Sequence, residues 1–256
     1  MLQATFIFLK GIGENTERLL WEAGIDSWDT FLTSPTLPKI ALARKVLYDQ
    51  ELIEAKKHYQ DQNARFFGRI LKSRDHWRLY DQFRHRTAYL DIETTGEPLP
   101  YGKITLVGIY GKGKMTTLIQ GENLSAARLQ EELSAFDVLV TFFGSGFDLP
   151  FLKGTYPQLI LNQPHIDLCF AARRLGFKGG LKAIEQTIGC ERSAEIEGLT
   201  GWDAVRLWDE WQEGNRSSKD KLIEYNAADC HNLEPLADLL YGRLLDRYGP
   251  PRDRTS

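Results

Sequence analysis

The sequence predicts an α/β fold in which helices cover a mixed β-sheet. Segments 104–110 and 115–119 read as strands joined by Gly-Lys-Gly, which is typical of an antiparallel hairpin. The apolar strands 88–92 and 138–143 are separated by that hairpin and by a helical stretch, and helical periodicity dominates after residue 168. Hairpin strands followed by alternating helix and strand indicate a mixed sheet flanked by helices.

The remaining elements of this region complete the sheet and its cover. Residues 125–136 are predicted as a helix that Ser125 or Asn123 can cap. Residues 165–168 are predicted as a short strand, and the chain after it as helical to about Tyr248.

Composition and pattern divide the 256 residues into four segments. With 42% hydrophobic residues, the chain can bury one sizeable core and a smaller appendage. We expect a small N-terminal helical region, a basic helical connector, a domain containing the sheet, and a frayed tail. Their predicted boundaries are 1–38, 39–86, 87–248 and 249–256.

The connector is predicted as a long helix interrupted near Gly68, with an apolar face and a charged face. The apolar face consists of Leu42, Val46, Leu47, Leu52 and Ile53. The net charge of the chain is -3, yet the connector holds 12 Lys/Arg against 6 Asp/Glu. Its later cations are Arg65, Arg69, Lys72, Arg74 and Arg78. A basic segment joined to an acidic domain suits a protein that holds phosphates with one part and cations with the other, although a solvated charged face is the default for any single residue.

Cys169, Cys190 and Cys230 show no CxxC spacing, which argues against a disulfide framework and suits a reducing cytoplasm. A zinc site at Cys230 and His231 lacks nearby partners, so buried small side chains are the favoured interpretation. No segment approaches the roughly 20 apolar residues of a membrane span, and no secretory signal is present. We therefore expect a soluble, cytoplasmic protein without a membrane partner.

Asp91 and Glu93 stand at the end of the first strong strand, separated by one apolar residue. Alternate residues of a strand point to one face, so the two carboxylates project together and Ile92 points into the core. Their mutual repulsion favours a bound cation, although an ordinary solvated strand end is the alternative. Thr94 and Thr95 then begin a tight exit whose backbone amides could approach a substrate end.

Asp148 follows the strand 138–143 through Gly-Ser-Gly-Phe, a flexible turn. With Pro150 two residues later, Asp148 is also a candidate helix N-cap, and a capping carboxylate at a strand end can still face a metal. Tyr225 and Asp229 are four residues apart in a helical stretch and therefore share one face. The alternative is a packed tyrosine and a surface acid. The two alanines between them predict a close approach of this helix to the sheet.

The order of these segments resembles the DEDD exonuclease superfamily, which has the ribonuclease H-like fold. Asp91 and Glu93 match its first motif in the form Asp-Ile-Glu-Thr-Thr-Gly. Residues 147–152, Phe-Asp-Leu-Pro-Phe-Leu, resemble the second motif of family B DNA polymerase proofreading domains. Tyr225 and Asp229 match the third motif in its tyrosine form.

The histidine form would have His five residues before that aspartate, where this chain has Glu224. The resemblance covers about residues 87–240 and is similar in detail to the YprB-type branch, including His-Ile-Asp-Leu at 165–168 and Leu-Lys-Ala-Ile at 181–184. One departure concerns an Asn that many relatives carry before the second-motif aspartate, since Phe143 and Gly144 occupy that region here. The departure removes no metal ligand and affects the expected positioning of the substrate strand.

The resemblance implies a five-stranded ribonuclease H-like mixed sheet and a 3′-to-5′ exonuclease with two Mg²⁺ or Mn²⁺ ions. It implies that Asp91 bridges both ions, that Glu93 and Asp229 complete the first, and that Asp148 holds the second. Tyr225 would orient the attacking water. We also expect Thr94, Thr95 and Phe147 to contact nucleic acid.

A second nucleic-acid contact is predicted near the N-terminus. Gly11 and Gly13 flank Ile12 and precede a helix, which resembles half of a helix-hairpin-helix that binds phosphate through backbone amides. The segment Thr5 to Leu9 is predicted as a strand rather than the first helix of that motif, and residues 23–28 as a helix end and a new cap. Structural helix packing is the alternative. The basic connector, with Arg65, Arg69 and Lys72, favours binding.

Single-stranded or 3′-end DNA is the preferred substrate. An exoribonuclease, a structure-selective endonuclease and a non-catalytic nucleic-acid-binding scaffold are the alternatives, because a metal site recognises phosphate and not the sugar. The sequence does not predict the oligomeric state.

Overall fold

The computed structural model describes residues 1–190 and 192–251, and within them the strands form one five-stranded mixed sheet in the order β3-β2-β1-β4-β5. The strands are β1 (Thr87–Thr94), β2 (Ile104–Gly111), β3 (Lys114–Ile119), β4 (Val138–Thr141) and β5 (His165–Asp167). β2 pairs antiparallel with both β1 and β3, whereas β4 pairs parallel with both β1 and β5. The predicted mixed sheet is therefore confirmed.

The β2–β3 hairpin turns on two residues with positive φ, Lys112 at 54° and Gly113 at 71°. Two consecutive left-handed residues match the right-handed twist of the flanking strands, which explains why Gly-Lys-Gly marks this hairpin. The prediction of a hairpin here is confirmed.

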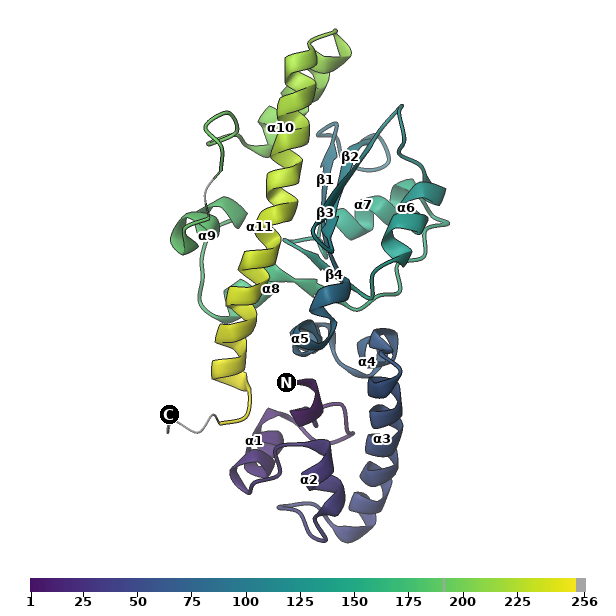
Figure 1. Ribbon diagram of the computed structural model, residues 1–256, viewed down its shortest axis with the longest axis vertical. Helices are drawn as coiled ribbons and strands as arrows, with labels where there is room; N and C mark the ends of the chain where they lie inside the picture. Colours follow the sequence, from purple (N-terminus) through teal and green to yellow (C-terminus); the bar gives the residue numbers. More distant parts are fainter. Residues whose placement is uncertain (191, 252–256) are drawn as a thin grey trace.

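Helices cover both faces of the sheet (Figure 1). One face carries α6 (Ala126–Ser134) and α7 (Asp148–Thr155), which pack on the apolar side chains of β1, β2 and β4. The other face carries the long helix α11 (Arg216–Tyr248) with α8 (Leu168–Arg174), α9 (Leu181–Ile188) and α10 (Gly201–Gln212) around it. Ser125 caps α6 by accepting from the Arg128 amide, while Asn123 accepts from the Ile119 amide instead.

α11 crosses the sheet at a glycine. Gly108 of β2 lies opposite Asp91 of β1, and a Cβ at Gly108 would come 2.2 Å from Asn226 Oδ1 and 2.6 Å from Cys230 Sγ. The helix therefore approaches the sheet because the strand lacks a side chain there. The predicted close approach is confirmed; Ala227 and Ala228 are half-buried, and Ala228 packs against the cluster that contains Leu106 of β2.

Residues 1–86 form the long helix α3 and several shorter helices around a core that continues into the C-terminal half of α11 (Figure 1). Aromatic packing is prominent in this core, with Trp28 between Phe67 and Tyr59. The elements are η1 (Leu2–Ala4), α1 (Glu14–Glu22), α2 (Trp28–Thr33), α3 (Leu42–Gln60), α4 (Ala64–Ile70), η2 (Ser73–Leu79), α5 (Tyr80–Phe83) and η3 (Arg84–Arg86). The helix end and new cap predicted for residues 23–28 are confirmed, because α1 ends at Glu22 and Ser27 caps α2.

The strand predicted from Thr5 to Leu9 is wrong. The chain there consists of turns after η1, and the amides of Phe6 and Ile7 donate to Glu17 Oε1 at 2.6 and 3.3 Å. A carboxylate thus takes the place of a neighbouring strand as acceptor for these amides.

The prediction for the connector is wrong in part. A break that was not predicted lies between α3 and α4, where Gln62 has a φ of 52° and Asn63 caps α4, and the helix then ends at Ile70, close to Gly68. The predicted apolar face is also largely exposed. Leu42, Val46, Leu47 and Ile53 are between 51% and 70% exposed, and only Leu52 of the five is buried.

The face of α3 that packs inward contains amphipathic residues instead. Tyr48 is buried and donates to the Lys10 carbonyl at 2.7 Å, and Lys45 is buried beside it with its ammonium on Asp49 at 2.8 Å. Long polar side chains bury their apolar stems while their ends find partners, so apolar periodicity alone identified the wrong face.

The basic residues of the connector differ in exposure. Arg65, Arg69 and Lys72 are exposed, but Arg78 is fully buried on Glu17 and Arg74 pairs with Glu14 of α1. None of the helices in the described ranges is long and apolar enough to cross a membrane. Most of the predicted tail, residues 252–256, lies outside the described residues.

Candidate active site

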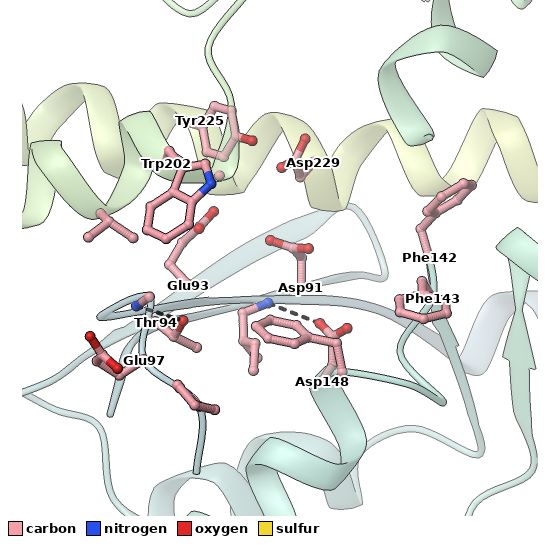
Figure 2. Close-up of a pocket in the computed structure, with 16 residues that line it drawn as sticks. Asp91, Glu93, Thr94, Glu97, Phe142, Phe143, Asp148, Trp202, Tyr225 and Asp229 are labelled. Atoms are coloured by element: carbon pink, nitrogen blue, oxygen red, sulfur yellow. Dashed lines mark hydrogen bonds between the residues drawn. The ribbon is translucent and has the colours of Figure 1, made fainter. Parts of the chain in front are cut away.

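Five predicted residues line one pocket of about 640 Å³. Asp91 and Glu93 come from β1, Asp148 from the start of α7, and Tyr225 and Asp229 from α11. Figure 2 shows Asp91 and Glu93 pointing from the strand toward Tyr225 and Asp229 on the helix above them. Segments more than 130 residues apart in sequence thus meet at one point, as the sequence predicts.

Asp91 and Glu93 lie on one face of β1, as the alternation of side chains along a strand predicts. Ile92 is buried in the core beneath, while Asp91 and Glu93 face the pocket. Asp91 Oδ2 accepts from Asn226 Nδ2 at 2.9 Å. Glu93 Oε1 is buried and has no hydrogen-bond partner. A buried, unpartnered carboxylate oxygen is costly unless a cation or donor meets it.

One carboxylate oxygen from each of Asp91, Glu93 and Asp229 lies within 4.8 Å of the other two. Burial, and then the neighbouring acids Asp229 and Glu93, raise the pKa of Asp91 well above its usual value. Burial, with Asp229 and Asp148, does the same to the pKa of Glu93. A divalent cation would remove this repulsion and restore the charged forms.

Asp148 lies beside this group and not within it. The prediction that Asp148 is an N-cap is wrong: α7 begins at Asp148 itself, after Phe147, and Asp148 Oδ1 accepts from the Ile92 amide at 3.2 Å. The bond ties the second predicted segment to the first through the backbone of β1. Burial raises the pKa of Asp148 to about 7, against the opposing effect of its backbone hydrogen bonds.

Tyr225 accepts a hydrogen bond from Lys182 Nζ at 2.8 Å. Burial, and then the acids Asp229 and Glu93, raise the pKa of Tyr225, so the hydroxyl keeps its proton at neutral pH. Lys182, on α9, also donates to the carbonyl of Leu199. Because Lys182 supplies a donor to the oxygen, the hydroxyl proton of Tyr225 is free to point into the pocket.

Arg192 forms ion pairs with Asp229 and with Glu185, the latter at 2.8 Å. Burial raises the pKa of Asp229, and Arg192 opposes that shift. The sequence offers no periodic or local signal for Arg192, which reaches Asp229 from a segment 37 residues away. The same holds for Lys182 and Asn226, whose partners are defined only by folding.

The predicted nucleic-acid contacts separate into two groups. Thr94 and Phe147 line the pocket, whereas Thr95 lies outside its lining and accepts from the Lys103 amide at 3.0 Å. Among the described residues, the other five predicted contacts lie in the N-terminal region and do not line this pocket. They are Gly11, Gly13, Arg65, Arg69 and Lys72.

The pocket also contains aromatic residues that the sequence analysis assigns no role. Trp202 from α10 and Phe143 after β4 line it, on opposite sides of the carboxylates (Figure 2). An isolated exposed tryptophan in an amphipathic helix carries no local signal for a site. The Phe143 position was noted only as a departure from relatives.

The zinc alternative finds no support in the described residues, where the metal-competent group consists of Asp91, Glu93 and Asp229. Cys169 and Cys230 are buried and Cys190 is half-buried, and all three are free thiols. The preference for small buried side chains is confirmed for two of the three.

Three solved structures align with 60–69% of this chain. A family B DNA polymerase from the archaeon Pyrobaculum calidifontis aligns with a TM-score of 0.50 and 16% identity over 60% of this chain, and the chain covers 24% of the polymerase. A structure described as "apo form of the nuclease" aligns at TM-score 0.48 with 21% identity over 64% of this chain and 76% of its own. The EXO domain of Nibbler from Aedes aegypti aligns at 0.48 with 11% identity, over 69% and 88%. At 16% identity the likeness to the polymerase concerns the fold alone.

A family model described as RNase_H superfamily matches residues 88–241, more than half of the chain. The chain therefore belongs to the RNase H superfamily, and its mixed sheet with flanking helices is an RNase H-like α/β fold. No curated protein matches the chain by sequence.

Proposed function

We propose that this protein is a metal-dependent 3′-to-5′ exonuclease that hydrolyses DNA phosphodiester bonds, of the tyrosine-type DEDD class and its YprB-like branch. One observation carries the proposal: oxygens of Asp91, Glu93 and Asp229 lie within 4.8 Å of one another at the base of a pocket of about 640 Å³. Burial and the neighbouring acids raise the pKa values of Asp91 and Glu93, and the buried Glu93 Oε1 has no hydrogen-bond partner, so a bound cation would stabilise this cluster.

The donor set fits hard divalent cations. All four candidate ligands are carboxylates, which suits Mg²⁺ or Mn²⁺ better than zinc. Asp91, Glu93 and Asp229 would hold one ion, and Asp91 with Asp148 a second. The unpartnered Glu93 Oε1 supports this assignment, since a cation would satisfy it.

Bound ions of this kind stabilise charge on a phosphate in the transition state and lower the pKa of a water nucleophile. The protein side chains would then orient the reactants. Tyr225 keeps its proton, so it acts as a hydrogen-bond donor to the attacking water or to a phosphate oxygen and not as a base. Lys182 holds the Tyr225 oxygen at 2.8 Å and so sets the direction of the hydroxyl.

Arg192 occupies one of the oxygens that a metal ion would use. Its guanidinium contacts Asp229 Oδ1, leaving Oδ2 of that carboxylate for a cation. We expect ion binding either to share Asp229 with Arg192 or to displace the guanidinium toward Glu185, its second partner at 2.8 Å.

The polarity and the DNA preference rest on the motif resemblance. Residues 147–152 resemble the second motif of polymerase proofreading domains, which degrade DNA from a 3′ end, and Phe147 lines the pocket next to Asp148. The acids recognise phosphate in either nucleic acid, so the sugar preference needs a direct comparison.

The test uses purified protein with 5′-labelled single-stranded DNA, duplex DNA and RNA, each with Mg²⁺ or Mn²⁺. Asp91→Ala is the inactive variant. Asp220→Ala is the matched control, because Asp220 is an exposed acid on α11, outside the pocket lining. We expect a ladder that shortens from the 3′ end of DNA with the wild type and with Asp220→Ala.

Each other result selects a different function. Faster shortening of RNA would make the protein an exoribonuclease. Cuts in a circular strand would make it an endonuclease. Binding of nucleic acid without cleavage under any metal condition would contradict catalysis and support a scaffold.

A further inference from the structure

A buried arginine lies beside the acidic cluster. Arg192 Nη2 donates to Asp229 Oδ1, and Asp229 is one of the three acids whose oxygens lie within 4.8 Å of one another. The Arg192 side chain is 7% exposed and lines a neighbouring hollow of about 420 Å³ instead of the acidic pocket. Asp229 therefore lies between the pocket, which it lines, and the guanidinium.

Asp229 differs in this contact from the other acids of the pocket. In the described part of the chain, it is the one acid of the five in the lining that forms an ion pair. Asp91 accepts from the uncharged amide of Asn226 at 2.9 Å, and Glu93 Oε1 has no partner. The ion pair of the cluster thus involves a residue that the proposed function assigns to a divalent ion.

The guanidinium of Arg192 has an anchor of its own. Its Nε donates to Glu185 Oε2 at 2.9 Å and its Nη2 donates to Glu185 Oε1 at 2.8 Å, a two-point contact that orients an arginine on a carboxylate. Glu185 is 2% exposed, and Asn232 Nδ2 donates to the same Oε1 at 3.0 Å. Because this anchor does not involve Asp229, Arg192 can lose its contact with Asp229 and remain a paired buried charge.

Lys182 is the second cation near Asp229, and it has other partners. Its ammonium donates to the Tyr225 hydroxyl at 2.8 Å and to the Leu199 carbonyl, and it lies 4.6 Å from the centre of the Tyr225 ring. Among the described side chains, Arg192 is the one that hydrogen-bonds to the Asp229 carboxylate. The two cations therefore have different positions, Lys182 on the tyrosine and Arg192 on the acid.

We propose that Arg192 is a resident cation that occupies Asp229 in the metal-free protein and competes there with a divalent ion. The inference rests on the proposed function, because it takes Asp229 as an ion ligand. Two cations on one carboxylate repel each other, so an ion at Asp229 favours the guanidinium on Glu185 alone. The competition lowers the affinity of the site for divalent ions, and it stabilises the acidic cluster while no ion is bound.

The affinity of the full chain for Mn²⁺ tests this competition, as measured by isothermal titration calorimetry and by the electron paramagnetic resonance signal of free Mn²⁺. Arg192→Met removes the charge and keeps a long side chain. We expect this variant to bind Mn²⁺ about 10- to 100-fold more tightly than the wild type, the factor that corresponds to one hydrogen bond with a charged group. Arg192→Lys keeps the charge without the two-point contact, so its affinity should lie between those of the wild type and Arg192→Met.

Glu185→Gln should change the affinity in the opposite direction. Without the charge of its anchor, Arg192 pairs with Asp229 alone, so Mn²⁺ should bind more weakly than to the wild type. Arg128→Met is the matched control, because Arg128 also contacts two carboxylates, Glu131 and Glu132, but lies exposed on α6 outside the pocket lining. Its Mn²⁺ affinity should equal that of the wild type.

Thermal unfolding in EDTA and in saturating Mn²⁺ gives a second readout. In EDTA, Arg192→Met should melt at a lower temperature than the wild type, because its acidic cluster has lost the resident cation. The rise in melting temperature on adding Mn²⁺ should be larger in Arg192→Met, since the variant binds the ion more tightly.

Unchanged or weaker Mn²⁺ binding in Arg192→Met would overturn the competition, and hydrolysis by the wild type in the same experiment would leave the nuclease intact. Tighter binding in Arg192→Met without hydrolysis of any strand by the wild type would support the competition and contradict the nuclease. Weaker binding in both Arg192→Met and Glu185→Gln would indicate a structural role and would also overturn it. If Arg192→Met does not fold, Arg192→Lys and Glu185→Gln decide, because the competition requires tighter binding in the first and weaker binding in the second.

Discussion

The protein buries carboxylates in two places, and the groups that surround them differ in charge. Glu17 of α1 is 1% exposed, and Arg78 meets both of its oxygens at 3.0 and 2.8 Å while the amides of Phe6 and Ile7 add to one of them. In the acidic pocket, Asp91, Glu93 and Asp229 lie together, and burial followed by the neighbouring acids raises the pKa values of Asp91 and Glu93 well above their usual range.

The difference shows that the groups around a buried carboxylate indicate its role. Where cationic and amide donors of the protein surround a carboxylate, as at Glu17, it joins two parts of the fold, here α1 and the segment before the sheet. Where buried carboxylates lie next to other carboxylates, their repulsion lowers the stability of the fold. A bound cation would offset that repulsion.

The sharpest test of this contrast is Asp91→Asn. We expect it to lower kcat/KM by at least about 1000-fold, more than the loss of a typical transition-state hydrogen bond. The melting temperature in EDTA should stay the same or rise, because one repelling charge is removed. Kinetics with Mn²⁺ and thermal unfolding by circular dichroism measure the two effects; near-normal activity would show that Asp91 is no metal ligand.

Glu17→Gln should show the opposite pattern. Arg78 would keep a buried charge without its partner, so we expect the free energy of unfolding to fall by about 3–5 kcal/mol. Each kcal/mol lowers the melting temperature of a chain of this size by about 2–4 °C. Activity per folded molecule should be unchanged, as judged by kinetics below the unfolding transition.

The double variant Glu17→Leu with Arg78→Met is the control for this interpretation. It removes both charges, so it should be less destabilised than Glu17→Gln. A single variant that unfolds no more readily than the wild type would show that the pair contributes nothing.

Gly108→Ala tests the link between the fold and the acidic pocket. Its Cβ would meet Asn226 Oδ1 at 2.2 Å, and Asn226 holds Asp91, so α11 must shift. We expect a destabilisation of about 1–3 kcal/mol, typical of overpacking, together with a weaker affinity for Mn²⁺. Calorimetric titration and denaturant unfolding measure the two.

Gly242→Ala is the matched control, since Gly242 lies in α11 with nothing within 4 Å of an added Cβ. It should stabilise the helix by about 1 kcal/mol and leave Mn²⁺ affinity unchanged. Equal effects of the two substitutions would contradict a close approach at Gly108.

The last prediction concerns the pH dependence of stability. Burial raises the pKa of Asp148 from 3.8 in the unfolded chain to about 7, so the folded protein binds more protons than the unfolded one between these values. Stability in EDTA should therefore fall as pH rises from about 4 to 7, and return as pH is lowered. Urea unfolding across this range should show a shallower dependence in Asp148→Asn; an identical dependence would exclude Asp148 as a source.

Much of the candidate site was predictable because its members follow local periods. The alternation along β1 places Asp91 and Glu93 on one face, and the four-residue spacing on α11 does the same for Tyr225 and Asp229. Asp148 lines the same pocket, but its predicted local role as a helix cap is wrong, because its oxygen accepts from the Ile92 amide.

The sequence by itself determined the elements whose geometry repeats within a few residues: the hairpin at Gly-Lys-Gly, the acid-bearing end of β1 and the helix that carries Asp229. Tertiary structure alone decided which side chains meet across long stretches of chain. It placed Arg192 on Asp229, Lys182 on Tyr225 and Trp202 over Gly96. It also turned an apparent apolar face of α3 outward, because Lys45 and Tyr48 found partners inside. Such contacts depend on the arrangement of whole elements in space, and no periodic pattern within one segment records them.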